Sequence, residues 1–389
     1  MTNPTVLVVS LKYSPVHGAH CLALGEPLRP EGYEVRYLVS SALAWTLPDA
    51  VRSRVRFLGW SRSAREVAWD SLADRTWRMA ELLGFLREAR PSAIIFESSH
   101  PSNEVVATLA RIARPEVRLW MLVHEPHVSS KLAHGLAHAV PIAAHEWALR
   151  RVLRHLDGVL LPSEEAVRQL RSSCPDFRGE VLRVPLLFAD RAKGAARERR
   201  YFSFIGHAVP AKGIETFFEL VETSASLGRP WEFQIATSTE ISRYLARLSP
   251  RARGALEVVA HSKLTDGEID EAIRSSWAVL APYRRVTQSG VVPVAFMHGT
   301  PVISTREGGM PEVVVPGETG YLVERDAHFG DWEACFRRVR DGFDGLSGRC
   351  RGCFLSRFDA RLAPSYLRPI LDTIDSPDRR PTTAASIAV

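Results

Sequence analysis

Short runs of apolar residues alternate along this chain with stretches of helical periodicity, and that alternation limits the folds open to it. The runs are continuously apolar, which is typical of parallel strands buried on both faces. A regular strand–helix–strand succession builds a doubly wound sheet through right-handed crossovers. The predicted strands are 5–10, 34–39, 93–97, 117–123 and 158–162 in the first half, and 201–206, 231–236, 256–260, 277–282 and 301–304 in the second.

The length and one charged segment divide this pattern into two α/β domains. A chain of 389 residues is too long for one ordinary core. Residues 191–200, RAKGAARERR, lack large apolar side chains and are predicted to be a linker between domains 1–190 and 201–358. We expect a helix over 359–375 that packs back on the first domain, and a disordered tail over 376–389. Two Rossmann-like domains facing across a cleft would bind ligands beyond the carboxyl ends of their strands.

The composition narrows the protein class. Hydrophobic residues make up 46% of the chain and charged residues 24%, as in soluble globular proteins. No apolar run is long enough to span a membrane, and the first apolar run lacks the basic segment of a signal peptide. The five cysteines are an odd number, and the Cys350–Cys353 pair has no second pair to complete a zinc site. We therefore predict a cytoplasmic protein with ordinary thiols.

The charge is mildly basic and evenly spread. The net charge of +6 divides into +3 for residues 1–190 (23 basic, 20 acidic) and +3 for the remainder (27 basic, 24 acidic). Without a dense basic stripe, nucleic acid is not expected as a partner. Residues 52–90 interleave arginine with Trp60, Trp69 and Trp77. This pattern fits an ordinary amphipathic helix, which we favour, and also peripheral contact with the inner face of a membrane.

The turns after the second-half strands suit an anion. Thr287-Gln288-Ser289-Gly290 precedes a predicted helix, whose free N–H groups would attract a phosphate; Ser289 fits equally well as a plain N-cap. Gly308-Gly309 follow the next strand and precede Pro311 at a predicted helix start. Two such turns on neighbouring strands favour a diphosphate over two ordinary turns, because glycine lets backbone amides approach an anion.

Lys212 and two turns in the first half of the chain are further candidate ligand-binding positions. Only five of the 50 basic residues are lysine, and Lys212 follows strand 201–206, where it suits a phosphate clamp as well as a plain surface position. Residues 15–19, PVHGA, are predicted to form a glycine turn into a helix after the first strand. His124-Glu125 follow strand 117–123, a position beside the predicted cleft. His134 and His138 are four residues apart but lack the glutamate of a zinc-binding motif between them. We therefore interpret them as neighbours on one face of a helix rather than as a metal site.

Together these turns resemble glycosyltransferase family 4, the retaining nucleotide-sugar glycosyltransferases of the GT-B fold. The most specific match is GTPVISTREGGMPEVVVPGETGYLVE, 299–324, where family members read GxPVIxTxxGGxPExVxxGxxGxLV. A second match is FIGHAVPAKGIE, 204–215, which is similar to the family's FxGRxxxxKG. The resemblance covers nearly the whole chain and implies the GT-B fold.

The resemblance also implies a role for particular residues. It makes His124 and Lys212 the catalytic pair, with His124 near the donor sugar and Lys212 on the donor diphosphate. Gly18 would let a first-domain loop approach the donor. The donor-binding residues it implies are Gly18, Gly206, His207, Lys212, Gln288, Ser289, Gly290, Gly308 and Gly309.

The chain departs from the family pattern at three positions. His207 replaces the usual arginine, and Val286 and Val294 replace paired glutamates that serve the donor sugar and the ribose. Those glutamate roles cannot be carried over. The stretch TQSGVVP resembles a family variant in which Gln288 and Ser289 stand near the donor, and that variant tends to carry a His-acid-Pro element such as the one at His124.

The expected function is transfer of a sugar, with retention of configuration, from a nucleotide-diphosphate donor to an acceptor hydroxyl. The acceptor is left open among carbohydrate, lipid-linked and small-molecule hydroxyls. No DxD-like acidic pair lies at a cleft turn, so we expect no cofactor and no essential metal. The alternatives are a non-catalytic sugar-nucleotide-binding partner subunit and, within the same fold, an epimerase or phosphorylase.

Overall fold

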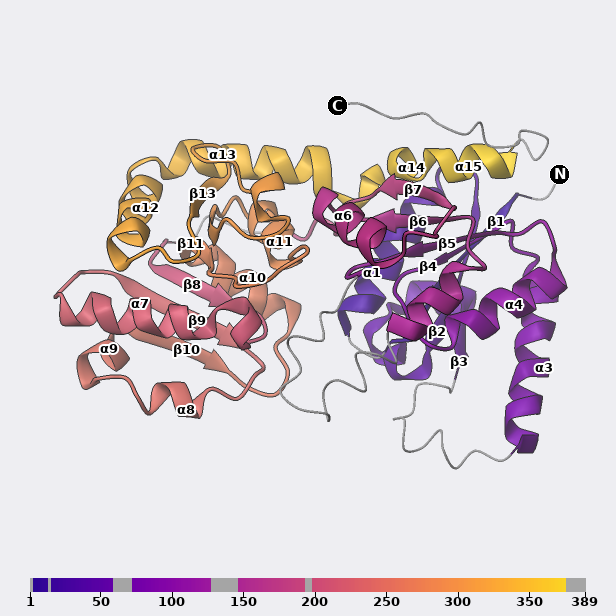
Figure 1. Cartoon of the computed structure of the whole chain (residues 1–389), viewed down its shortest axis with the longest axis horizontal. Helices are drawn as coiled ribbons and strands as arrows, with labels where there is room; N and C mark the ends of the chain where they lie inside the picture. The colour runs from indigo at the N-terminus through magenta and orange to yellow at the C-terminus, as the bar shows by residue number, and fades with distance from the viewer. Residues whose placement is uncertain (1–2, 13–14, 59–71, 127–145, 193–197, 376–389) are drawn as a thin grey trace. The chain divides into compact units, whose positions relative to one another are not determined.

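The computed structural model describes residues 3–12, 15–58, 72–126, 146–192 and 198–375. The chain divides into two compact units, which are coloured along the chain in Figure 1. The first unit comprises the residues up to Ala189 together with the chain from Ala360 onward, and the second unit runs from Asp190 to Asp359. Each unit is built around its own parallel sheet.

The sheet of the first unit has the order β3-β2-β1-β4-β5-β6-β7 in the described residues, and every neighbouring pair is parallel. Chain order therefore reverses between β1 and β4, the switch point at which doubly wound sheets bind ligands. The strands are β1 (Thr5–Ser10), β2 (Glu34–Ser40), β3 (Val55–Leu58), β4 (Ala93–Phe96), β5 (Arg118–Leu122), β6 (Gly158–Leu161) and β7 (Glu180–Arg183).

Helices cover this sheet and bury its apolar faces. The described helices are α1 (Pro15–Gly25), η1 (Glu26–Leu28), η2 (Ser41–Thr46), η3 (Asp49–Arg54), α3 (Leu72–Ala89), α4 (Asn103–Ala113) and α6 (Glu164–Ser173). The C-terminal elements η9 (Ala360–Leu362), α14 (Ala363–Tyr366) and α15 (Arg368–Asp375) also belong to the first unit. The Tyr33 hydroxyl donates to Asp375 at 2.6 Å and ties α15 to the segment before β2.

The second unit repeats the doubly wound order, β10-β9-β8-β11-β12-β13, again all parallel. Its strands are β8 (Tyr201–Ile205), β9 (Glu232–Thr237), β10 (Leu256–Ala260), β11 (Ser276–Ala281), β12 (Val302–Thr305) and β13 (Gly320–Val323). Its helices are η6 (Pro210–Lys212), α7 (Ile214–Ser226), α8 (Ser242–Leu245), α9 (Pro250–Gly254), α10 (Asp266–Arg274), α11 (Val291–Met297), η7 (Met310–Glu312), α12 (Phe329–Asp341), α13 (Phe343–Cys353) and the π-helix η8 (Phe354–Phe358). The rings of Phe202 and Phe336 stack with centroids 4.2 Å apart in its core.

These two sheets confirm the predicted fold class of paired doubly wound domains. Three strands, β3, β7 and β13, were not predicted. The predicted cleft depends on how the two units are placed relative to each other, and it stays a prediction. Part of the predicted linker (193–197) and the predicted tail (376–389) lie outside the described residues. No described helix is long and apolar enough to cross a membrane.

Candidate active site

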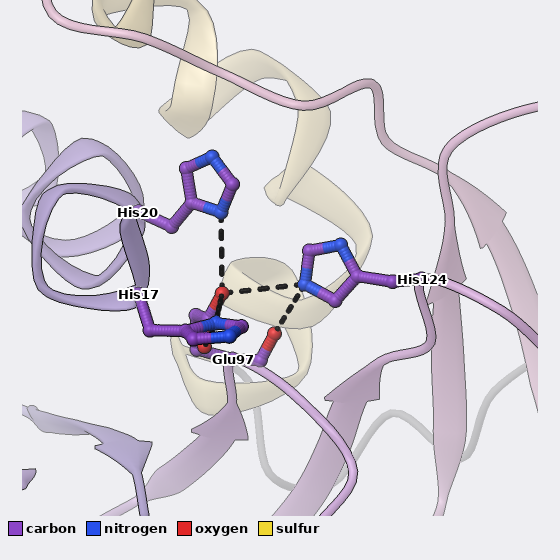
Figure 2. Close-up of side chains that lie close together, drawn as sticks. All are labelled: His17, His20, Glu97 and His124. Atoms are coloured by element: carbon purple, nitrogen blue, oxygen red, sulfur yellow. Dashed lines mark hydrogen bonds and ion pairs between the residues drawn. The ribbon is translucent and has the colours of Figure 1, made fainter. Parts of the chain in front are cut away.

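Four polar side chains meet at the switch point of the first sheet, as Figure 2 shows. His17 and His20 stand three apart on α1, so both project from the same side of that helix. Glu97 comes directly after β4, and its backbone N–H donates to the Val9 carbonyl of β1 at 2.8 Å. His124 follows β5. Three segments far apart in the sequence therefore converge on one carboxylate.

The Glu97 carboxylate lies at the centre of this first-unit cluster, which comprises His17, His20, Glu97 and His124. His17 Nδ1 is 2.9 Å from Oε1 and 2.8 Å from Oε2 of Glu97. His20 Nδ1 and His124 Nε2 each lie 3.2 Å from Oε1. His124 Nε2 also lies 3.0 Å from the backbone carbonyl oxygen of Glu97. One carboxylate oxygen thus has three imidazole nitrogens within reach.

The Glu97 carboxylate of this cluster is buried, and its pKa depends on its neighbours. Glu97 is fully buried, and the Ser10 hydroxyl donates to its Oε2 at 3.1 Å. Burial alone would raise the pKa of Glu97, but the hydrogen bonds from His124, His17 and His20 together hold it well below its usual range. Glu97 is therefore a carboxylate in the folded protein, and its neighbours must supply the compensating positive charge.

The imidazole rings also pack on one another. The His20 and His124 rings stack with centroids 5.8 Å apart, and His17 meets His124 edge-on at 6.0 Å. The ring of Phe188 meets the ring of His20 edge-on, with centroids 5.1 Å apart. Three imidazoles and one carboxylate within 4.8 Å of one another are a donor set that could hold a metal ion. They could equally form a hydrogen-bonded network.

The predicted anion turns of the second unit are brought together after β8, β11 and β12. The amides of Arg284 and Arg285 donate to the Ala211 carbonyl at 3.0 and 3.1 Å, which joins the β11 turn to the turn that carries Lys212. The Thr305 hydroxyl donates to the Tyr283 carbonyl at 2.5 Å, which joins the β12 turn to the β11 turn. Because β8 and β11 flank the switch point, the three turns lie where this kind of sheet binds ligands.

Lys212 lies over an aromatic side chain in this group. Its Nζ is 5.4 Å from the centre of the Tyr283 ring, within the range of a cation–π contact. The Tyr283 hydroxyl in turn shares a hydrogen bond of 2.8 Å with Ser289 Oγ. Lys212 and Ser289, which are far apart in the sequence, are thus linked through one buried tyrosine ring. Sequence reasoning did not single out Tyr283.

Two glycines of these turns have no room for a side chain. Gly213 has φ +68°, and a Cβ there would lie 1.7 Å from the Pro282 carbonyl oxygen. Gly308 has φ +53°, and its Cβ would lie 1.7 Å from the Val286 carbonyl oxygen. Both turns therefore press against the β11 turn through bare backbone, which is why glycine is required there.

The remaining predicted donor residues lie in the same turns. Gly206 follows β8 with φ +113°, and His207 next to it is exposed. Gln288 is half-buried in the β11 turn, Gly290 is the N-cap residue of α11, and Gly309 precedes η7. Their contacts with a donor stay predictions.

The structure corrects two local expectations and excludes one of the two readings of Ser289. Residues 15–19 are not a glycine turn: α1 begins at Pro15, and Gly18 lies inside it, where a Cβ would come within 2.6 Å of Thr46 Oγ1. Ser289 is not an N-cap, because Gly290 holds that position without a side-chain cap. Pro311 is not the first residue of a helix: it is the second residue of a short 3-10 turn, η7, which begins at Met310.

Most of the first-unit cluster was not predicted from the sequence. His124 was predicted as a site residue, but Glu97, His17 and His20 were not. An acidic residue closing the apolar strand AIIFE, and two histidines three apart after the first strand, were the available signals. His134 and His138 lie outside the described residues.

Comparison with known families identifies the chain. Its first unit matches the family model described as "Glycosyl transferase 4-like domain" over residues 17–186. Its second unit matches the model described as "Glycosyl transferases group 1" over residues 199–338. Together these segments take in most of the sequence. The chain is a member of the glycosyltransferases that these models describe. No curated protein matches the sequence.

Solved structures show the same GT-B fold for this glycosyltransferase. A sucrose-phosphate synthase from Thermosynechococcus elongatus matches with a TM-score of 0.68 and 14% identity, over 97% of this chain and all of that one. A glycosyltransferase from Rickettsia africae matches with a TM-score of 0.69 and 11% identity, over 97% and 100% of the two chains. Anabaena HepE in complex with UDP matches with a TM-score of 0.65 and 12% identity, over 95% and 100%. At such identities the likeness concerns the fold alone.

Proposed function

We propose that this glycosyltransferase moves a sugar from a nucleotide-diphosphate donor to an acceptor hydroxyl with retention of configuration. The observation that carries the proposal is the meeting of three predicted anion turns around Lys212 at the switch point of the second sheet. HepE, a structural neighbour, was solved with UDP, which supports a nucleotide-sugar donor. Retention follows from the family resemblance of the motifs.

The second unit is proposed to stabilise the departing diphosphate. Negative charge grows on the diphosphate as the glycosidic bond breaks, so fixed positive groups at that point lower the barrier. Lys212, half-buried at the end of η6, would supply a full charge. Amides of the glycine-rich turns would supply further donors. Because α11 has only seven residues, we assign more of this task to Lys212 and the turn amides than to the helix dipole.

We further propose that the diphosphate leaves without a bridging divalent metal. Within residues 206–213, 282–290 and 305–309, which the structure describes in full, Glu307 is the one acidic side chain. A bridging Mg²⁺ in a nucleotide site is usually held by acidic side chains as well as phosphates. Nucleotide affinity should therefore be the same with EDTA as with Mg²⁺.

His124 is proposed to contact the transferred sugar from the first unit, through its ring or its backbone carbonyl. The side chain is 17% exposed, so part of it remains accessible beside the buried Glu97. The acceptor is proposed to be a carbohydrate, lipid-linked or small-molecule hydroxyl. Cytoplasmic location and contact with a membrane surface stay predictions from the sequence, since Trp60 and Trp69 lie outside the described residues.

The test is a transfer assay on the wild-type chain and on His124→Ala. Each protein is incubated with nucleotide sugars and a mixed pool of acceptors, and both the released nucleoside diphosphate and the glycosylated product are measured. We expect His124→Ala to lower kcat by at least about 100-fold and to leave nucleotide affinity within about threefold. The control is His155→Ala, a partly exposed histidine of the same unit that lies outside the cluster.

Three outcomes would contradict this assignment. Equal turnover in His124→Ala would remove His124 from the site. Nucleotide binding without any transfer by the wild-type chain would favour the non-catalytic partner subunit, which the valines at 286 and 294 in place of paired glutamates also suggest. Interconversion of the donor sugar without an acceptor would favour the epimerase.

A further inference from the structure

The first-unit cluster has the composition of a transition-metal site. It offers three imidazole nitrogens and one carboxylate, all within 4.8 Å of one another. Imidazole suits Zn²⁺, Co²⁺, Ni²⁺ and Fe²⁺, and a carboxylate completes many such sites, whereas Mg²⁺ and Ca²⁺ prefer oxygen alone. We propose that His17, His20, Glu97 and His124 bind one divalent transition-metal ion of the zinc type.

The distances from Glu97 Oε1 to the three ring nitrogens are compatible with ligands of one ion. Ligand atoms lie about 2.0–2.2 Å from Zn²⁺, so neighbouring ligands of one ion lie roughly 3.0–3.5 Å apart. The nitrogens of His20 and His124 lie 3.2 Å from Glu97 Oε1, and that of His17 lies 2.9 Å from it. The Glu97 carbonyl oxygen lies 3.0 Å from His124 Nε2.

The alternative to a bound ion is a network of hydrogen bonds. The Glu97 carboxylate has about four lone-pair directions, and its neighbours within hydrogen-bond distance are Ser10 and the three histidines. In that network each of the three ring nitrogens carries its hydrogen on the side that faces Glu97. With a bound cation the same nitrogens direct lone pairs at the ion, so metal uptake distinguishes the two arrangements.

The charge balance of the cluster is compatible with a bound ion. Among the described residues, the groups within hydrogen-bond or ion-pair distance of the Glu97 carboxylate are Ser10 and the three histidines, and none is arginine or lysine. The buried carboxylate needs a positive charge beside it, and a divalent ion held by the three imidazoles would supply that charge. The Ser10 hydroxyl then holds the second carboxylate oxygen, as neighbours of metal-bound carboxylates commonly do.

The cluster also lies where the fold binds ligands. Glu97 and His17 follow β4 and β1, the two strands on either side of the first switch point. The expectation of no essential metal rested on the lack of an acidic pair at the donor turns, and it did not consider these side chains, which only folding brings together. Binding of this ion is independent of whether the donor diphosphate needs Mg²⁺.

The experiment measures metal binding directly on the full chain. The protein is purified without a histidine tag, stripped with a chelator and titrated with Co²⁺, while visible absorption reports an ion bound by imidazole and carboxylate. Zn²⁺ is then added as a competitor, and the metal content is determined by mass spectrometry. We expect about one ion per chain, displaced by Zn²⁺, and a Tm that rises with Zn²⁺ concentration by mass action.

Variants locate the ion. We expect Glu97→Gln and His20→Ala to weaken Co²⁺ binding by at least about 100-fold, because loss of even an indirect partner of a metal ligand costs 10–100-fold. His155→Ala is the control and should bind as the wild type does. If the two buried variants do not fold, His17→Ala replaces them, since the His17 side chain is 14% exposed.

Two results would overturn the proposal. One is a wild-type chain that takes up neither Co²⁺ nor Zn²⁺ in proportion to its concentration, in which case the cluster is a hydrogen-bonded network. The other is uptake that survives equally in the cluster variants, which would place the ion elsewhere. Neither result depends on glycosyl transfer.

Discussion

Gly213 shows how a single position fixes the contact between two loops of the second unit. It has a left-handed backbone between η6 and α7, and the space beside it is occupied by the Pro282 carbonyl of the β11 turn. Any side chain would have to push that carbonyl away. The position of Lys212, directly before Gly213, therefore depends on residue 213 having no side chain.

Gly213→Ala should accordingly destabilise the second unit by at least about 1–3 kcal/mol, through the strained φ and the clash with Pro282. In a unit of this size that lowers Tm by several degrees in a thermal melt. Gly330→Ala is the matched control, because Gly330 lies in α12 with nothing within 4 Å of an added Cβ. Equal Tm values for the two variants would mean that the β11 turn is not packed as described.

Individual site residues differ in how far the sequence could reveal them. Lys212, Ser289 and Gly308 sit in linear motifs, so their spacing along the chain was enough. Glu97 is 80 residues from His17 and 27 from His124 along the chain, and it was predicted only as the last residue of a strand. Its role depends on the crossovers that place β1, β4 and β5 side by side. Only tertiary structure supplies that information.

The prediction of strands from the sequence was limited in a similar way. The central strands were predicted from continuous apolar runs, and β1 agrees with its predicted range residue for residue. The strand β7, EVLR, was not predicted because it has only four residues, alternately exposed at the edge of the sheet. β3 is equally short and half-exposed. Edge strands bury one face at most, so they lack the apolar run on which the prediction relied.

The helix α10 provides an element-level prediction about acid stability. Its Asp270 accepts hydrogen bonds from Arg191 at 2.9 and 3.1 Å, and His298 Nε2, at the C-cap position of α11, lies 3.1 Å from Oδ1. Burial alone would raise the pKa of Asp270, but His298 and Arg191 together lower it. The Asp270 carboxylate thus connects the segment around Arg191, which leads into the second unit, to α10 and to the end of α11.

A carboxylate with a lowered pKa contributes stability that is fully present above its unfolded value of about 3.9 and is lost as the pH falls through the folded value. We therefore expect Asp270→Asn to lower the Tm of the second unit at pH 7 and to flatten the decline of Tm below about pH 4. Thermal melts from pH 7 to pH 3 measure both effects. A variant whose decline parallels that of the wild type would show that the Asp270 contacts add no stability.

The whole molecule repeats one architecture twice and gives the two copies different side chains. Both sheets reverse their order after the first strand of the unit, and both place candidate residues at that reversal. The first unit offers histidines around a buried carboxylate, whereas the second offers Lys212 and glycine turns with few acidic groups. The proposed function assigns the nucleotide to the second unit and the transferred sugar to the first.

The most direct test of that division is nucleotide binding by the full chain. Thermal shift is measured with UDP-, GDP-, ADP- and dTDP-sugars for the wild type, Lys212→Ala and the control Lys263→Ala, an exposed lysine of the same unit. We expect one nucleotide family to raise Tm, with affinity about 10–100-fold weaker in Lys212→Ala and unchanged in Lys263→Ala, since a charged hydrogen bond contributes about 1.5–3 kcal/mol. No shift with any nucleotide, or an equal shift in Lys212→Ala, would contradict the assignment of the donor site.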